Sequence, residues 1–86
     1  MSWDFQLASA AQRALRRLHE PDKSRINQAL NAMKDDPLSG DTIALKGEYN
    51  GLFRRRVGSW RIIFRIKPDE QVILIADIAR RTSTTY

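Results

Sequence analysis

Residues 52–67 read LFRRRVGSWRIIFRIK, two alternating blocks on either side of Gly58-Ser59. Alternation with a period of two is typical of strands whose two faces differ in polarity. A two-residue connection that begins with Gly suits the tight turn of a β-hairpin. The stretch therefore predicts strands over residues 52–57 and 60–67, paired antiparallel.

The same alternation sorts the side chains of this hairpin into two faces. One face holds Trp60, Ile62, Phe64 and Ile66, with Phe53 and Val57 beside them and Arg55 between those two. The opposite face holds Arg54, Arg56, Arg61 and Arg65. If the apolar face packs against helices, these arginines converge on the open face of a sheet. Arg80 and Arg81 then arrive at the end of the neighbouring strand.

The residues before the hairpin predict a short strand and two helices. Trp3, Phe5 and Leu7 alternate with polar residues as in a strand, and Ser9 then offers an N-cap. Two apolar stripes at helical spacing follow, Leu7, Ala11, Leu15 and Leu18 in the first and Ile26, Ala29, Leu30 and Met33 in the second. Two helices this close in sequence favour an antiparallel helical hairpin, and the second ends before Pro37.

Residues 37–51 read as a connection, in which we expect Leu45 to cover the edge of the core. A turn at Pro68-Asp69-Glu70 leads into a last strand over residues 72–79, apolar on both faces and therefore central. The order is β-α-α-β-β-β. It predicts one α+β domain over residues 1–86, in which a two-helix hairpin packs on one face of a mainly antiparallel four-stranded sheet.

The composition excludes several classes of site. The 86 residues include no Cys, so disulfides and thiolate chemistry are absent, and the single His19 cannot by itself form a metal site or a Ser-His-Asp triad. No apolar run approaches the ~20 residues that span a bilayer, and the N-terminus lacks the apolar core of a signal peptide. We therefore expect a cytoplasmic protein without a membrane partner.

The net charge of +5 lies entirely in the C-terminal half of the chain. Residues 1–45 carry six basic and six acidic side chains, whereas residues 46–86 carry nine basic and four acidic ones. A one-sided basic field favours a polyanion such as RNA or DNA, or an acidic protein segment. The alternative is a basic surface that serves solubility.

Three segments together form a recognisable pattern: Ala44-Leu45-Lys46-Gly47, then residues 51–64 (GLFRRRVGSWRIIF), then Ile78-Ala79-Arg80-Arg81 with Tyr86. This pattern resembles the RelE/ParE toxin superfamily, on the side of the RelE-like mRNA interferases. The helical hairpin and the strand order agree as well, so the resemblance covers nearly the whole chain.

The resemblance implies the toxin of a toxin–antitoxin pair, an endoribonuclease that cleaves mRNA in the ribosomal A site and so inhibits translation. It implies a cognate, RelB-like antitoxin as partner, together with mRNA and rRNA on the ribosome, and neither metal nor cofactor. The positions that match the family's catalytic residues are Arg54, Arg56, Arg61, Arg80, Arg81 and Tyr86, with either Arg80 or Arg81 as the arginine after the last strand. Lys46 and Arg65 are expected RNA contacts, and Arg55 a structural residue or an antitoxin contact.

Arginines suit cleavage by the 2′-hydroxyl of the RNA itself. Their planar guanidinium groups donate charge-assisted, bidentate hydrogen bonds to phosphate, and such preorganised donors stabilise the charge that develops on the phosphoryl group. Tyr86 can stack on a base or transfer a proton. The proton acceptor is left open, with Lys46 and Glu48 as outside candidates.

Two other function classes compete with this interpretation. A ParE-like inhibitor shares the fold but poisons DNA gyrase and cleaves no RNA, and its relatives usually lack the arginine and tyrosine set. A non-catalytic basic module merely docks an antitoxin or a nucleic acid. Salt-dependent RNA binding without cleavage would identify that third class.

Overall fold

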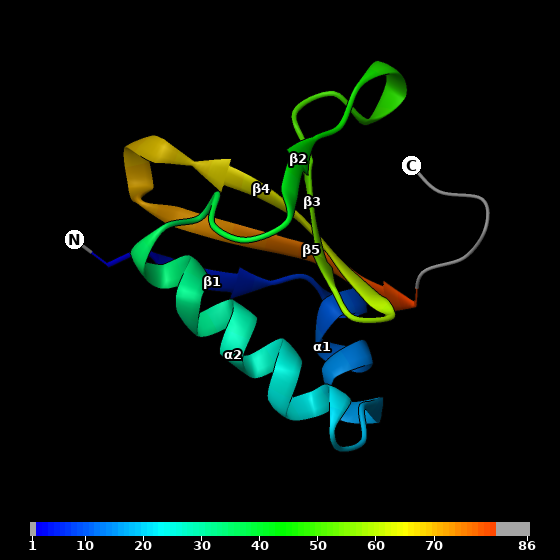
Figure 1. The fold of residues 1–86 in the computed structure, drawn as a ribbon. Helices are drawn as coiled ribbons and strands as arrows, with labels where there is room; N and C mark the ends of the chain where they lie inside the picture. The colour runs from blue at the N-terminus through cyan, green and yellow to red at the C-terminus, as the bar shows by residue number, and fades with distance from the viewer. Residues whose placement is uncertain (1, 81–86) are drawn as a thin grey trace.

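The computed structural model describes residues 2–80, in which two helices lie against one five-stranded sheet (Figure 1). The elements in chain order are β1 (Asp4–Leu7), α1 (Ser9–Arg17), α2 (Asp22–Asp35), β2 (Thr42–Ala44), β3 (Phe53–Val57), β4 (Trp60–Lys67) and β5 (Val72–Arg80). Single turns of 3-10 helix lie at Gly47–Tyr49 and Pro68–Glu70. The predicted α+β class is confirmed, and the predicted elements occur in the predicted order with one additional strand, β2.

The sheet order is β1-β5-β4-β3-β2, with β1 parallel to β5 and every other pair antiparallel. The predicted hairpin is present, because Val57 pairs with Trp60 across the two-residue turn and Gly58 has a φ of +59°. The last strand lies inside the sheet as predicted, between β1 and β4. The sheet has five strands rather than four, since Thr42–Ala44 in the expected connection pairs with β3.

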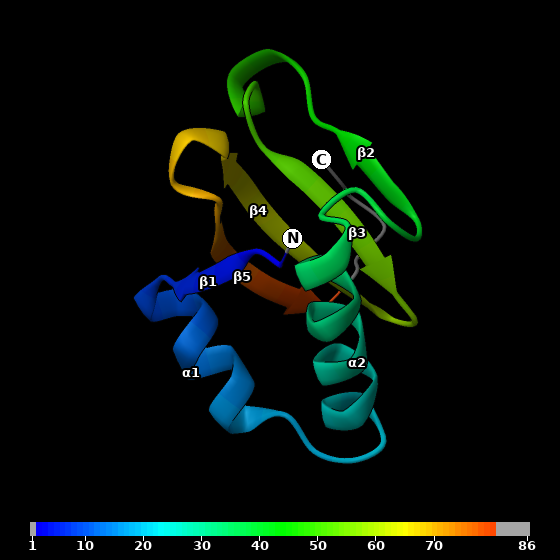
Figure 2. The ribbon, with the colours of Figure 1, turned by 90° about the vertical axis from the view of Figure 1, so that its left-hand side faces the viewer.

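Both helices cover the same face of the sheet and diverge from their short connection (Figure 2). Helix α1 lies against β5, and α2 lies beneath β3. The core consists of Ala11, Leu18, Ile26, Ala29, Leu30 and Met33 from the helical side and Ile62, Phe64, Ile73, Ile75 and Ile78 from the sheet. The expectation that Ser9 caps α1 is wrong, because Ser9 is the first helical residue and Ala8, which has no capping side chain, precedes it.

Within residues 2–80, neither α1 nor α2 lies on the opposite face of the sheet (Figure 2). Leu45 is 6% exposed, but it follows Ala44, which pairs with core-facing Phe53, so alternation directs Leu45 to this open face instead of the core. Ile63 and Val72 are also buried there, outside the core cluster. None of the helices described over residues 2–80 is long and apolar enough to cross a membrane.

Candidate functional site

Arg54 and Arg56 lie on the open face at β3, held by one carboxylate. Asp41, just before β2, places Oδ1 3.5 Å from Arg54 Nη1 and Oδ2 3.7 Å from Arg56 Nε. The Asp41 carbonyl accepts hydrogen bonds from Arg56 N at 2.9 Å and from Arg54 Nη1 at 3.4 Å. The two guanidinium groups are thereby tethered to one loop residue, side by side on the sheet.

The side chains of these two arginines are accessible to different degrees. That of Arg54 is 13% exposed, and that of Arg56 is 43% exposed. The ion pair between Arg56 and Asp41 is open to solvent, and such pairs contribute little to stability. A phosphate can therefore replace Asp41 as the partner of Arg56 at small cost.

The two expected RNA contacts are both exposed. Arg65 lies on the open face of β4, and its guanidinium approaches Gly51 closely enough that a Cβ there would be 3.5 Å from Arg65 Nη1. Lys46 precedes the turn Gly47–Tyr49 that links β2 to β3. Arg54, Arg56 and Arg65 thus share one face of the sheet, and Lys46 lies on the adjoining loop.

Arg61 lies on the face that the alternation predicted, but its side chain is not accessible there. It points to the open face, between Arg56 on β3 and Ala79 on β5, but it is only 4% exposed. Its Nη2 donates to the carbonyl of Arg80 at 3.4 Å. The expectation that it is a solvent-accessible strand arginine is therefore wrong.

Arg80 lies on the other side of the sheet from this cluster. It pairs with Trp60, whose side chain packs against the core, and its guanidinium carbon is 5.8 Å from the centroid of the Trp60 ring. It is therefore not brought together with Arg54 and Arg56. The other two expected catalytic residues, Arg81 and Tyr86, lie outside the described residues.

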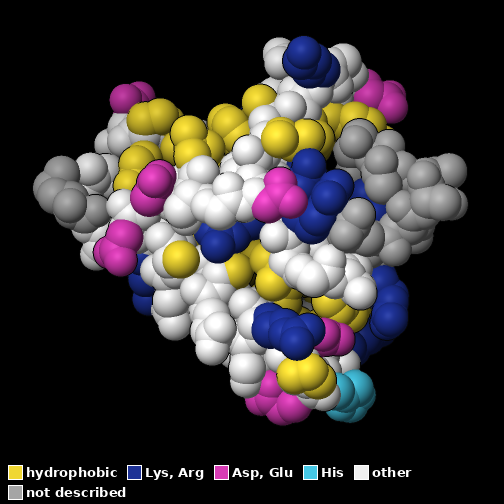
Figure 3. All heavy atoms as spheres, in the orientation of Figure 1, with side chains coloured by type: hydrophobic (Ala, Val, Ile, Leu, Met, Phe, Trp, Pro, Cys, Tyr) yellow, Lys and Arg dark blue, Asp and Glu magenta, His cyan; other side chains and the backbone are white. Residues whose placement is uncertain are grey.

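The surface above the sheet is apolar at its centre. Figure 3 shows hydrophobic side chains gathered in a hollow between the β4–β5 end and the loop after β2, with basic side chains beside them. Ile43, which pairs with Arg54 on the same face, is 46% exposed. The open face therefore offers both apolar surface and cationic donors to a ligand.

Asp41 is the contributor to this site that the sequence did not reveal. It lies 13 residues from Arg54 and at the start of a strand that the pattern did not predict. The only available signal was the segment Ile43-Ala44-Leu45, whose pairing with β3 brings Asp41 next to the arginines.

Known structures share this architecture. The chain superposes on the RelBE2 toxin–antitoxin complex of Mycobacterium tuberculosis with a TM-score of 0.83 and 22% identity, covering 94% of this chain and 100% of that one. For the archaeal RelE–RelB complex of Pyrococcus horikoshii the TM-score is 0.83 at 23% identity, and the match covers 98% of this chain and 100% of that one. For a YoeB/ParE toxin from Agrobacterium tumefaciens the TM-score is 0.80 at 18% identity, and the match covers 92% of this chain and 99% of that one. These likenesses establish the fold.

The sequence itself identifies the family. No curated protein matches the chain. The model of the ParE toxin of the type II toxin–antitoxin system, parDE, matches residues 5–84. Because that match spans nearly the whole sequence, the chain belongs to the ParE toxin family, within the RelE/ParE superfamily of toxins from toxin–antitoxin pairs.

Proposed function

We propose that this toxin is an endoribonuclease that cleaves mRNA in the ribosomal A site and thereby inhibits translation. The observation that carries the proposal is the placement of Arg54, Arg56 and Arg65 on one helix-free face of the sheet. A row of guanidinium groups on an open sheet suits a phosphodiester backbone, because each can donate two parallel hydrogen bonds to one phosphate.

In the proposed reaction the 2′-hydroxyl of the RNA attacks the adjacent phosphorus. The bond between the 2′ oxygen and phosphorus forms as the bond to the 5′ oxygen breaks. A base accepts the 2′-hydroxyl proton and an acid returns one to the 5′ oxygen. The products are a 2′,3′-cyclic phosphate and a 5′-hydroxyl end. Arg54 and Arg56 stabilise the charge that gathers on the phosphoryl oxygens.

The remaining residues take separate roles in this proposal. Asp41 positions the guanidinium groups of Arg54 and Arg56, and joins Lys46 and Glu48 as a candidate proton acceptor. Arg81 and Tyr86 keep the catalytic roles that the family resemblance implies. Arg61 supports the floor of the site, since its side chain is enclosed beside Arg56. Arg80 is not assigned to catalysis.

We also propose a RelB-like antitoxin as the neutralising partner. The similar structures from M. tuberculosis and P. horikoshii are toxin–antitoxin complexes. The basic half of this chain suits an antitoxin with an acidic or amphipathic neutralising segment, laid over the helices and the sheet as helix or strand.

The test is inducible expression in a bacterium, with mapping of mRNA 5′ ends in the presence and absence of a translation block. We expect growth arrest and new ends inside codons, formed only while ribosomes translate. Arg56→Gln should reduce those ends by about a hundredfold, the scale reported for loss of one preorganised donor. Arg13→Gln, an exposed arginine on α1, removes the same charge and should leave cleavage unchanged. New ends that persist in the Arg56 variant would contradict the site assignment.

A second candidate is inhibition of DNA gyrase. The family model names ParE toxins, and the burial of Arg61 removes one of the arginines that distinguished the RNA-cleaving interpretation. Growth arrest without new mRNA ends, accompanied by loss of negative supercoiling in a plasmid, would favour this candidate over cleavage.

A further inference from the structure

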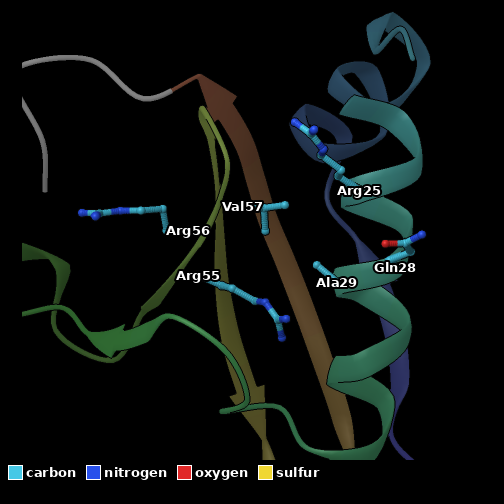
Figure 4. Close-up of a pocket in the computed structure, with 6 residues that line it drawn as sticks. All are labelled: Arg25, Gln28, Ala29, Arg55, Arg56 and Val57. Carbon is cyan, nitrogen blue, oxygen red and sulfur yellow. The ribbon is translucent and has the colours of Figure 1, made fainter. Parts of the chain in front are cut away.

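The segment that leads from α2 into β2 contacts side chains on both faces of β3. Its residues 39–41 meet the three consecutive arginines at positions 54–56. Asp41 binds Arg54 and Arg56 on the open face. Figure 4 shows Arg55 pointing from β3 towards α2, whereas Arg56 points away from that helix. The segment is therefore held from the open face and from the covered side at once.

Arg55 contacts this segment through its guanidinium group. Its Nη1 donates a hydrogen bond to Ser39 Oγ at 2.8 Å. A Cβ at Gly40 would lie 2.7 Å from Arg55 Nη2, so a side chain at that position would displace the guanidinium group. The φ of Gly40 is +70°, which glycine adopts at little cost. The chain is therefore shaped to receive Arg55 immediately before Asp41.

Only Gly40 separates Ser39 from Asp41, and the chain between them forms a compact turn. The Ser39 carbonyl accepts a hydrogen bond from Thr42 Oγ1 at 2.7 Å, and the Gly40 carbonyl accepts one from Thr42 N at 3.0 Å. The Asp41 carbonyl accepts a further bond from Arg56 N at 2.9 Å. Because these bonds tie the turn together, a displacement of Ser39 would also displace the Asp41 carboxylate.

The surroundings of Arg55 are unfavourable for its charge. Within residues 2–80, no carboxylate lies within 4 Å of an Arg55 nitrogen. Its Nε is buried without an acceptor, and burial lowers the pKa of Arg55 because desolvation disfavours the charged form. A partly buried guanidinium group with a neutral partner carries a desolvation cost that an apolar side chain would not. What Arg55 supplies in return is the contact that fixes Ser39 and Gly40.

We infer that Arg55 is a positioning residue for the open face, on which its own side chain does not lie. By fixing the turn that carries Asp41, it keeps the Asp41 carboxylate beside Arg54 and Arg56. The contacts alone carry this inference about the placement of the two guanidinium groups. That the placement serves RNA cleavage rests on the proposed function.

Side-chain NMR of the free toxin tests the placement without RNA or ribosomes. The toxin is made by cell-free synthesis with ¹⁵N-arginine, and the Nε–Hε resonance of Arg56 is assigned by its absence in Arg56→Lys. The ¹⁵N–¹H NOE of this resonance reports how well the guanidinium group is ordered. Arg55→Met removes the positioning group, and Ser39→Ala removes only the hydroxyl that accepts its hydrogen bond.

Arg25→Met is the matched control. Arg25 lines the same cavity of about 270 Å³ between α2 and β3 as Arg55 does. It lies at the β3–β4 turn, where its Nη1 would be 3.9 Å from a Cβ at Gly58, and not at residues 39–41. This substitution should therefore leave the Arg56 NOE unchanged.

We expect Arg55→Met and Ser39→Ala each to lower the NOE of Arg56 Nε. Asp41→Asn should lower it as well, and adding Arg55→Met to Asp41→Asn should lower it no further, because Arg55 acts through Asp41. The midpoint of urea unfolding should not fall in Arg55→Met. An unchanged Arg56 NOE in Arg55→Met, or additive losses in the double variant, would overturn the inference.

Cleavage on ribosomes tests the consequence for the proposed function. At saturating toxin, Arg55→Met should slow mRNA cleavage about tenfold, because misplaced donors stabilise the transition state less well. In the Asp41→Asn background the same substitution should have no effect. Full cleavage by Arg55→Met would contradict the inference. If the parent toxin cleaved no mRNA, the proposed function would fail, and the NMR outcomes would still decide the role of Arg55.

Discussion

Arg61 and Arg65 point to the same face of β4, but their surroundings differ. Arg61 is 4% exposed and bonded to the carbonyl of Arg80, whereas Arg65 is exposed. Arg61→Ala removes a buried aliphatic stem as well as a charge, so it should lower the free energy of unfolding by about 2 kcal/mol or more. Arg65→Ala should change it by less than about 0.5 kcal/mol.

Urea unfolding followed by far-UV circular dichroism measures both changes. Equal stabilities for the two variants would contradict the structural role of Arg61. The comparison also decides how an inactive Arg61→Ala toxin is interpreted, because loss of folding would account for loss of toxicity without any catalytic role.

The sequence predicted which face each of these arginines occupies, but not how deeply each is buried. Alternation placed Arg54, Arg56 and Arg65 correctly on the open face, because period two is a property of one strand. The burial of Arg61 is a property of the folded molecule, in which Arg61 pairs with Arg56 and Ala79, and the register between strands is not written in either strand alone.

At the level of elements, α2 is anchored by a residue that precedes it. Glu20 Oε1 accepts hydrogen bonds from Ser24 Oγ at 2.6 Å and from Ser24 N at 3.0 Å, which occupies an otherwise unpaired amide of the first turn. These bonds lower the pKa of Glu20 below its usual value of 4.5. The bond from the Ser24 hydroxyl contributes most, followed by the bond from the Ser24 amide. The partial positive charge at the N-terminus of a helix also stabilises a nearby carboxylate.

A carboxyl whose pKa falls on folding stabilises the native state above its unfolded pKa, and this contribution is lost as pH falls through the folded pKa. Glu20→Gln should therefore be less stable than the parent at pH 7. The difference should shrink once the pH falls below 4.5 and the native carboxyl protonates. Thermal unfolding at pH 7 and pH 3 tests this, with Glu48→Gln as a matched substitution away from α2. An equal difference in stability at both pH values would refute the stabilising role of the Glu20 carboxylate.

One strand and one register shift escaped prediction for geometric reasons. Strand β2 has three residues, too few for any period to be detected, and it exists because Thr42 to Ala44 pair with β3. The register between β4 and β5 shifts by one residue, so that Ile63 pairs with Asp77 whereas the next residue, Phe64, pairs with Ile75. This bulge at Ala76 reverses the alternation beyond it and turns Arg80 to the helical face, away from Arg54 and Arg56.

On the scale of the whole molecule, the sheet separates two cationic sites. Its open face carries Arg54, Arg56 and Arg65, whereas Arg25 and Arg55 lie on the covered side, where they help to line a cavity between α2 and β3. An RNA strand on the open face would therefore not contact Arg25 or Arg55.

The open face should make RNA binding dependent on salt. If Arg54, Arg56 and Arg65 each neutralise one phosphate of a single strand, the logarithm of the affinity should fall against the logarithm of salt with a slope of about −2. That slope corresponds to roughly a twentyfold loss between 50 and 200 mM salt. Arg56→Gln should flatten it by about 0.7, whereas Arg25→Gln should leave it unchanged, because Arg25 faces the cavity on the other side of the sheet. Fluorescence anisotropy of a labelled 12-nucleotide RNA measures all three slopes. A slope that Arg25→Gln flattens as much as Arg56→Gln would mean that the RNA reaches the covered face, and that the two sites are not separate.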